Sequence, residues 1–218
     1  MSRDDTPHLL ELLPPEDLLI RRWPLVPVLV LPLLATVCDK LGEIVIVPEF
    51  EMSFSFEAGL GAWAPGGLDL MDPPVVWSVS SSSLEASDGD RSVRFDLDNL
   101  NGQAKIWIFR EFEVAPHQRY DIDISLDLAT ADASTDAWQL IAGAHTAPPE
   151  SSSQLRVHDA TAATGSGGGS IEWVTKEYTV QGQADEEGLL YIIVGVWGTG
   201  PGARTYYVDD VRLVMTRR

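Results

Sequence analysis

Basic residues and cysteine are scarce in this sequence, and each shortage excludes a class of protein. Lysine occurs only at Lys40, Lys105 and Lys176, and 15 Lys and Arg residues stand against 33 Asp and Glu, for a formal net charge of −18. A basic surface of the kind that binds nucleic acid or anionic lipid is therefore excluded. The single cysteine, Cys38, excludes an intramolecular disulfide.

Signatures of catalysis are missing as well. The four histidines, His8, His117, His145 and His158, are scattered without the spacing of a zinc site. There is no G-x-S-x-G nucleophile motif, and "GSGGGS" lacks the lysine of a phosphate-binding loop. Glycoside hydrolysis needs two carboxylates, and an Asp-rich chain offers such pairs by chance, but no motif surrounds any of them. We predict that the protein is not an enzyme.

The first part of the chain has the order of an export signal. Arg21 and Arg22 precede an apolar run over residues 23–37, which three prolines interrupt. This run is shorter than the ~20 residues that a membrane-spanning helix needs. Charge, apolar run and small residues in this order favour a secretory signal. The acidic stretch before it is long for such a signal, which indicates a true translation start near residues 18–20.

Cys38 follows "LLATV", and "LLATVC" resembles the lipobox of bacterial lipoproteins, in which the cysteine is lipidated. Val37 departs from that pattern, which has Gly, Ala or Ser before the cysteine. Ordinary cleavage near residues 35–38, an uncleaved anchor and a buried apolar segment are the alternatives. We expect an extension with a signal segment over residues 1–38, a domain over 39–218, and a secreted or membrane-anchored, extracytoplasmic protein.

From about residue 44 the apolar positions recur with period two, as in β-strands. In "RSVRFDLDNLNG", Val93, Phe95 and Leu97 share one face. The expected strands lie at 44–50, 52–63, 75–81, 91–102, 137–146, 171–180, 188–198 and 205–214, with a hairpin over 104–130 that turns near 115–118 and a Gly/Pro-rich connection at 64–74. Short strands with such turn spacing predict an all-β fold, an antiparallel β-sandwich of jelly-roll type.

Five short motifs occur in a familiar order: "FSFEAGLGAW", "SDGDRSVRF", "FEVAPHQRYDIDISL", "IEWVTKEYTV" and "TYYVDDVRL". Together they resemble the galactose-binding-like jelly rolls, of which the carbohydrate-binding modules of bacterial glycanases are the best-known group. The resemblance covers about residues 50–214. It implies a jelly-roll fold, a carbohydrate ligand, and burial of Trp63 and Trp173. Because one fold serves many ligands, the ligand has to be argued from the site.

Two adjacent aspartates interrupt the last expected strand. Strict alternation places Asp209 on the same face as Val211 and Leu213, and a buried carboxylate needs a partner or a metal. The family resemblance implies a structural calcium ion held by Asp209 together with Glu57 of the opening strand, since calcium takes six to eight oxygen ligands. We therefore expect the last strand to lie beside the first, which brings Glu57 and Asp209 near each other. The alternative is that Asp209 accepts hydrogen bonds from backbone N–H groups.

Sugar-binding surfaces combine aromatic faces with polar side chains. Alternation predicts such a mixture on the face turned away from the core, and the candidate ligand-binding residues are Arg94, Asp96, Trp107, Asp123, Tyr191 and Trp197. Trp107 and Trp197 have an alternative place beneath a neighbouring loop. The expected function is a non-catalytic domain that binds a glycan. The alternative is a structural or adhesion module of the cell envelope that contacts protein partners and no sugar.

Overall fold

The computed structural model describes residues 50–131, 138–158 and 171–218, which form two antiparallel sheets packed face to face. The six-stranded sheet contains β1 (Phe50–Phe54), β3 (Val76–Ser82), β4 (Ser92–Asn99), β6 (Arg119–Thr130), β9 (Val174–Gln183) and β11 (Gly202–Arg217). The five-stranded sheet contains β2 (Ala64–Leu68), β5 (Lys105–Glu113), β7 (Trp138–His145), β8 (Val157–His158) and β10 (Leu189–Gly198). The predicted all-β sandwich is confirmed, and the described residues contain no helix beyond the single 3₁₀ turn η1 (Ser152–Gln154).

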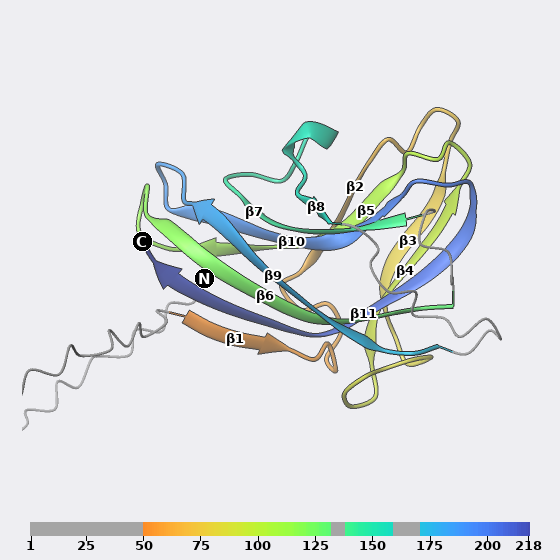
Figure 1. Cartoon of the computed structure of the whole chain (residues 1–218), viewed down its shortest axis with the longest axis horizontal. Coiled ribbons are helices and arrows are strands. Elements are labelled where there is room, and N and C mark those ends of the chain that lie inside the picture. The colour runs from red at the N-terminus through yellow and green to blue at the C-terminus, as the bar shows by residue number, and fades with distance from the viewer. Residues whose placement is uncertain (1–49, 132–137, 159–170) are drawn as a thin grey trace, which may run out of the picture. The chain divides into compact units, whose positions relative to one another are not determined.

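Strand β11 organises the six-stranded sheet. Its first half pairs with β4, its second half pairs with β1, and β6 runs along the other side of both halves. Figure 1 shows β1 and β6 flanking the C-terminal part of β11. The first and last strands therefore lie side by side as predicted, with Phe50 opposite Met215 and Phe54 opposite Val211. The chain passes between the sheets at most connections, as in a jelly roll.

The predicted hairpin over residues 104–130 is wrong in its pairing, although both of its strands exist. Strand β5 pairs with β2 and β10, whereas β6 pairs with β11 and β9 in the other sheet. The connection between them crosses the sandwich beside the β9–β10 connection, where the Val114 and His117 N–H groups donate to the Gly188 and Asp185 carbonyls. Alternation identifies a strand, but the connection is long enough to reach either sheet.

Two strands were not predicted. Strand β2 lies in the stretch interpreted as a Gly/Pro-rich connection, and β8 lies in the loop after β7. Both are edge strands of the five-stranded sheet, where Pro65 is tolerated because an edge strand need not donate every backbone N–H group. Gly66 is required there because a Cβ atom would lie 2.5 Å from the indole nitrogen of Trp107.

The main core fills the space between the sheets. It takes the inward side chains of alternating positions in both sheets, for example Phe95 on β4, Ile122 on β6 and Ile192 on β10. Trp63 and Trp138 belong to it and are 4% and 1% exposed. The burial of Trp63 is thus confirmed. The expected strand at residues 44–49, like the signal segment and Cys38, lies outside the described residues.

A β-bulge in β11 changes the predicted orientation of Asp209. The register with β6 shifts between Asp209 and Arg212, and Asp210 has a φ of 43°. The bulge lets Val208 and Val211 both reach the core, so Asp209 does not share the face of Val211 and Leu213. Instead Asp209 follows Tyr207 on the outer side, where the β3–β4 loop covers it completely. A bulge is a local insertion that a period-two pattern cannot reveal.

Candidate functional site

Glu57, in the turn after β1, and Asp209, on β11, hold the same loop. Asp209 Oδ2 accepts hydrogen bonds from the backbone N–H groups of Ser87 (2.9 Å) and Asp88 (3.1 Å). Glu57 accepts from the N–H groups of Asp90 (3.0 Å) and Arg91 (3.1 Å). The two carboxylates bind neighbouring residues of one loop. This confirms their proximity, which was predicted from the pairing of the first and last strands.

The geometry favours hydrogen bonding over calcium at this loop. The second oxygen of Asp209 accepts the Asp210 N–H group at 2.8 Å, so both its oxygens face donors, and an N–H group repels a cation. Burial raises the pKa of Asp209, while the hydrogen bonds from Asp88, Asp210 and Ser87 act in the opposite direction. Within the described ranges, no group of three or more His, Cys, Asp or Glu side chains is arranged for a metal. Calcium binding by Glu57 and Asp209 stays a prediction.

The six candidate ligand-binding residues do not form one surface. Arg94, Asp96 and Asp123 lie on the outer face of the six-stranded sheet. The others, Trp107, Tyr191 and Trp197, belong to β5 and β10 of the five-stranded sheet. Alternation separates inward from outward positions but does not assign a strand to a sheet, and the two outer faces of a sandwich point in opposite directions. The single mixed groove expected from the sequence is therefore corrected to two separate faces.

The outer face of the five-stranded sheet is covered where Trp107 lies. Residues 146–158, here called the covering segment, carry η1 and β8 and leave the sheet after β7 (Figure 1). Leu155 from this segment packs with Trp107, Ile141 and Ile193 in a second hydrophobic cluster. Trp107 is only 2% exposed, so its ring is not accessible to a sugar. Trp107 therefore packs beneath a loop, which was the alternative to a place in the binding surface.

Trp197 and Tyr191 lie at the margins of the covered area. The Lys105 ammonium is 4.4 Å from the centroid of the Trp197 ring and forms an ion pair of 2.5 Å with Asp69. The Ser152 hydroxyl also donates to Asp69 at 2.8 Å, which fixes the covering segment to the β2–β3 loop. These contacts, first the hydrogen bond from Lys105, lower the pKa of Asp69.

Arg94 and Asp96 are engaged with their neighbours. Arg94 forms an ion pair with Asp96 (2.7 Å), and the Thr205 hydroxyl donates to the same carboxylate (2.8 Å). Trp173, expected in the core, lies outside it and is half-buried, with its ring centroid 6.5 Å from that of Tyr207. Trp173 directly precedes β9, in which the odd-numbered positions such as Thr175 and Glu177 face outward, so its burial, expected from the family resemblance, is wrong.

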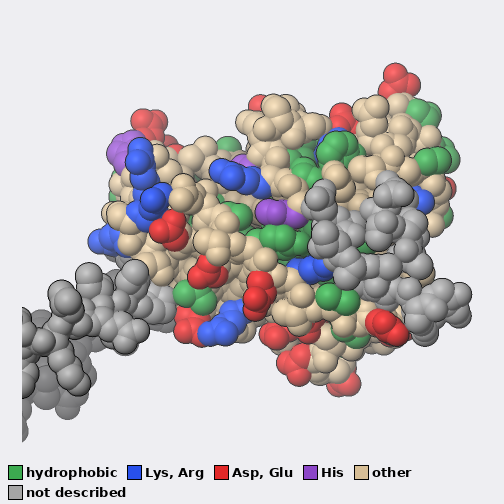
Figure 2. Space-filling model, in the orientation of Figure 1, with side chains coloured by type: hydrophobic (Ala, Val, Ile, Leu, Met, Phe, Trp, Pro, Cys, Tyr) green, Lys and Arg blue, Asp and Glu red, His purple; other side chains and the backbone are tan. Residues whose placement is uncertain are grey.

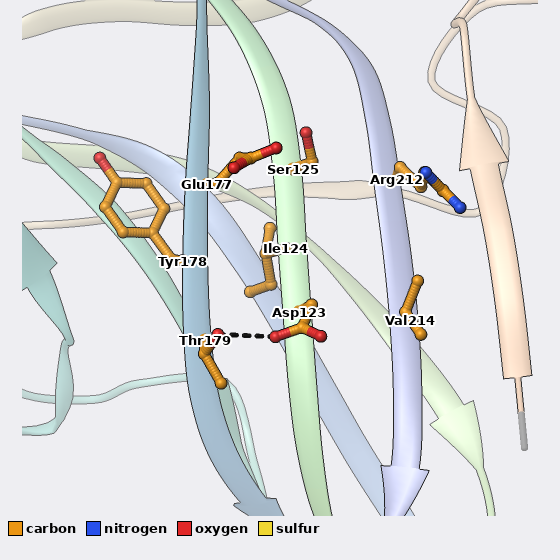
Figure 3. A pocket seen from close by; sticks show the side chains of 8 residues that line it. All are labelled: Asp123, Ile124, Ser125, Glu177, Tyr178, Thr179, Arg212 and Val214. Atoms are coloured by element: carbon orange, nitrogen blue, oxygen red, sulfur yellow. Dashed lines mark hydrogen bonds between the residues drawn. The ribbon is translucent and has the colours of Figure 1, made fainter. Parts of the chain in front are cut away.

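An open depression on the six-stranded sheet is a candidate site. It has a volume of about 520 Å³ and is lined from three adjacent strands. Six of the residues that line it are here called the polar trough: Asp123, Ser125, Glu177, Thr179, Arg212 and Val214 (Figure 3). Asp123 was predicted from the sequence; the other five were not, because the pairing of β6 with both β9 and β11 brings them together.

The trough is built from two rows of paired residues. Val214, Asp123 and Thr179 are directly opposite one another across three strands, and Arg212, Ser125 and Glu177 form the next row. The Thr179 hydroxyl donates to Asp123 at 2.6 Å, and Arg212 binds Glu51 of β1 at 2.5 Å. The remaining lining residues, Ile124 and Tyr178, alternate with these polar ones along their strands.

The surface around these elements has mixed charge. On the side shown in Figure 2, acidic side chains are spread among basic and uncharged ones and do not form one continuous patch. A surface of this kind keeps a protein soluble without identifying a binding site. The trough is therefore distinguished from the surrounding surface by its shape and its hydrogen-bonding groups.

No family model matches the chain, and no curated protein matches it. Solved structures similar to it include a carbohydrate-binding module of the β-sandwich superfamily (16% identity, TM-score 0.43, covering 74% of this chain and 60% of that one). Another is the xylan-binding domain CBM22-1 of Xyn10C from Paenibacillus barcinonensis (15%, TM-score 0.44, 77% and 94%). A third is a cleaved adhesin domain of Lys-gingipain from Porphyromonas gingivalis (15%, TM-score 0.48, 75% and 97%).

Carbohydrate-binding modules are thus among the structures that this chain is similar to, as the sequence motifs predicted. At these identities and TM-scores the similarity does not assign a ligand. In the described part of the chain, no helix has the length and apolar character needed to cross a membrane.

Proposed function

We propose that the domain is a non-catalytic glycan-binding module whose ligand lies in the polar trough. The observation that carries this proposal is the composition of the trough: two carboxylates, two hydroxyls and one guanidinium within a depression of about 520 Å³. Ligand sites commonly have this size, and a few placed polar groups orient the ligand. Sugar hydroxyls both donate and accept hydrogen bonds, so they match a lining that offers both.

The rigidity of the sheet supports the same proposal. All six trough residues are on paired strands, so a ligand need not order a loop to bind. The one aromatic residue of the lining, Tyr178, stacks on His158 with their ring centroids 3.9 Å apart. Since the other side chains supply mainly hydrogen bonds, the affinity would come chiefly from polar contacts. Asp123 and Glu177 are exposed to water, whereas a catalytic acid is usually kept protonated by burial, and this favours binding without hydrolysis.

Export belongs to the proposal as well. Glycans of the cell surface or its surroundings are found outside the cytoplasm, so a protein that binds them has to be exported. The segment from Arg21 to Cys38 has the charge and apolar run of a secretory signal, in the expected order. A lipid on Cys38 would anchor the domain to a membrane. Fractionation of cells that produce the Cys38→Ser variant tests the anchor, because an unlipidated protein leaves the membrane fraction.

The function is tested by affinity electrophoresis in gels that contain soluble polysaccharides. We expect retardation of the wild type by at least one neutral glycan and loss of retardation in the double variant Asp123→Ala/Glu177→Ala. The matched control is Asp98→Ala/Glu113→Ala, which removes the same charge from β4 and β5, outside the trough. Retardation that survives in the trough variant, or none with any glycan, contradicts the proposal.

One observation favours the alternative of a protein-binding adhesion module. Met71, Val76 and Leu100 are more than half exposed, and the Asn101 side chain donates to the Asp69 carbonyl, joining the two loops that carry Met71 and Leu100. Exposed apolar groups of this kind occur at protein contacts. An absence of glycan binding together with a partner lost in Met71→Ser would support this alternative.

A further inference from the structure

We propose that the polar trough selects glycans by charge: chains with free amino groups bind best, neutral chains less well and acidic chains worst. This inference rests on the proposed function and adds the chemical class of the ligand. It comes from the balance of charges in the trough and around its rim.

Neither of the two trough carboxylates forms an ion pair with another described residue. The partner of Asp123 is the neutral Thr179 hydroxyl, and Glu177 takes part in none of the ion pairs of the described strands. The two side chains come from adjacent strands and project on the same side of the sheet (Figure 3). Their negative charges therefore act together on whatever enters the trough.

The one cation of the trough is already paired. Arg212 lies beside the trough carboxylates, but its guanidinium binds Glu51 at 2.5 Å. An acidic sugar would have to displace Glu51 before it could use this guanidinium, and it would still face Asp123 and Glu177. On the same face Asp127 accepts from the Thr175 hydroxyl, which adds a further negative charge along β6.

The expected effect is moderate because the trough is open to water. Two unit charges 4 Å apart near a protein surface interact strongly enough to change a dissociation constant by on the order of tenfold or more at low salt. The same interaction weakens as ionic strength rises, since the Debye length is about 10 Å at 0.1 M salt. Hydrogen bonds to neutral hydroxyls are much less sensitive to salt.

The test uses pairs of glycans that differ only in charge. Polygalacturonate is compared with its methyl ester, and chitosan oligosaccharide with its N-acetylated form, each at low and at high salt. In each pair that binds, we expect on the order of tenfold weaker binding by polygalacturonate than by its methyl ester, and by the N-acetylated oligosaccharide than by chitosan oligosaccharide. Both differences should shrink at high salt.

Matched variants then locate the effect. In Asp123→Asn/Glu177→Gln the two members of each pair should bind with equal affinity, even where the overall affinity falls. Asp98→Asn/Glu113→Gln, which changes the net charge equally outside the trough, should keep the ranking. If the control also loses the ranking, the overall charge of −18 causes it and the inference is overturned.

Two further outcomes separate this inference from the function on which it rests. Equal or tighter binding of the acidic member of a pair overturns the charge selection but leaves glycan binding in place. No binding of any neutral, amino or acidic glycan overturns the proposed function itself, and the charge selection with it.

Discussion

The two outer faces of this sandwich are made by the same kind of strand and have opposite character. Along β6 the outward positions are polar, namely Asp121, Asp123, Ser125 and Asp127, and the face is open. Along β5 the outward positions include Trp107 and Phe109, and the covering segment lies over them. The difference teaches that the outward residues of a strand indicate whether a further layer of chain covers its sheet.

The sequence carries this difference in its periodicity. "DIDISLDL" in β6 alternates, as expected of a sheet with one face in water. "IWIF" in β5 and "YIIVGVW" in β10 are apolar at successive positions, as expected of strands buried on both faces. Gly66 and Gly195 flank Trp107, and a Cβ atom on either would collide with its side chain, so the covered face is closely packed.

The largest expected effect is the loss of stability in Trp107→Ala. Removing a fully buried aromatic side chain costs about 3–5 kcal/mol, because the cavity adds to the lost transfer free energy. Thr179→Ala, on the open face, should change the free energy of unfolding by no more than about 0.5 kcal/mol. Urea denaturation of the two variants measures both. A cost for Trp107→Ala as small as that of Thr179→Ala would show that the covering segment does not pack as described.

Asp209 is the exception on the open sheet, since it is fully covered, and its replacement should have an intermediate effect. Asn keeps one acceptor oxygen but turns an NH₂ group toward backbone N–H donors, so Asp209→Asn should cost about 1–3 kcal/mol. The neighbouring Asp210→Asn is the control: Asp210 is exposed, and Asn tolerates its positive φ.

The same denaturation experiment addresses calcium at this loop. Because donors already face both oxygens of Asp209, we expect a chelator to leave the midpoint of wild-type unfolding unchanged. A lower midpoint in the chelator, restored by added calcium, would support the calcium site of Glu57 and Asp209 over the hydrogen-bonded arrangement.

The alternation of apolar residues was enough to predict most strands, and the family resemblance predicted the pairing of the first with the last. Alternation failed where the outcome depends on contacts distant in sequence. The partners of β5 are one example: the five residues after it could lead to either sheet, and only packing against the β9–β10 connection decides. The bulge at Asp209 and Asp210 is another example. One inserted residue exchanges the inward and outward positions for the rest of the strand.

The candidate site was predictable only in part for the same reason. Asp123 is recognisably outward from its own strand, but Glu177 and Arg212 join it only through the pairing of β6 with two distant strands. Trp107 was predicted to contact a ligand because alternation places it on the outer face. Alternation does not reveal whether solvent or a covering segment lies above that face. The neighbours of Trp107, apolar at every position of "IWIF", were the signal that could have identified the cover.

The smallest expected effect concerns Tyr191, which lies at the margin of the covered face. The Tyr191 hydroxyl donates to Glu111 at 2.5 Å on the adjacent strand β5. This hydrogen bond, followed by burial and nearby carboxylates, raises the pKa of Tyr191 to about 12. Glu111→Gln removes the negative charge and weakens the hydrogen bond, so the phenol should ionise at lower pH, with little change in stability because the pair is exposed.

The measurement is the alkaline absorbance change of tyrosine, taken as the difference between wild type and Glu111→Gln, in which the other tyrosines cancel. Glu113→Gln is the control, since Glu113 lies two residues further along the same strand and is paired with Leu189 instead. Superimposed titration curves for wild type and Glu111→Gln would mean that Tyr191 does not face Glu111. The margin of the covered face would then not be arranged as described.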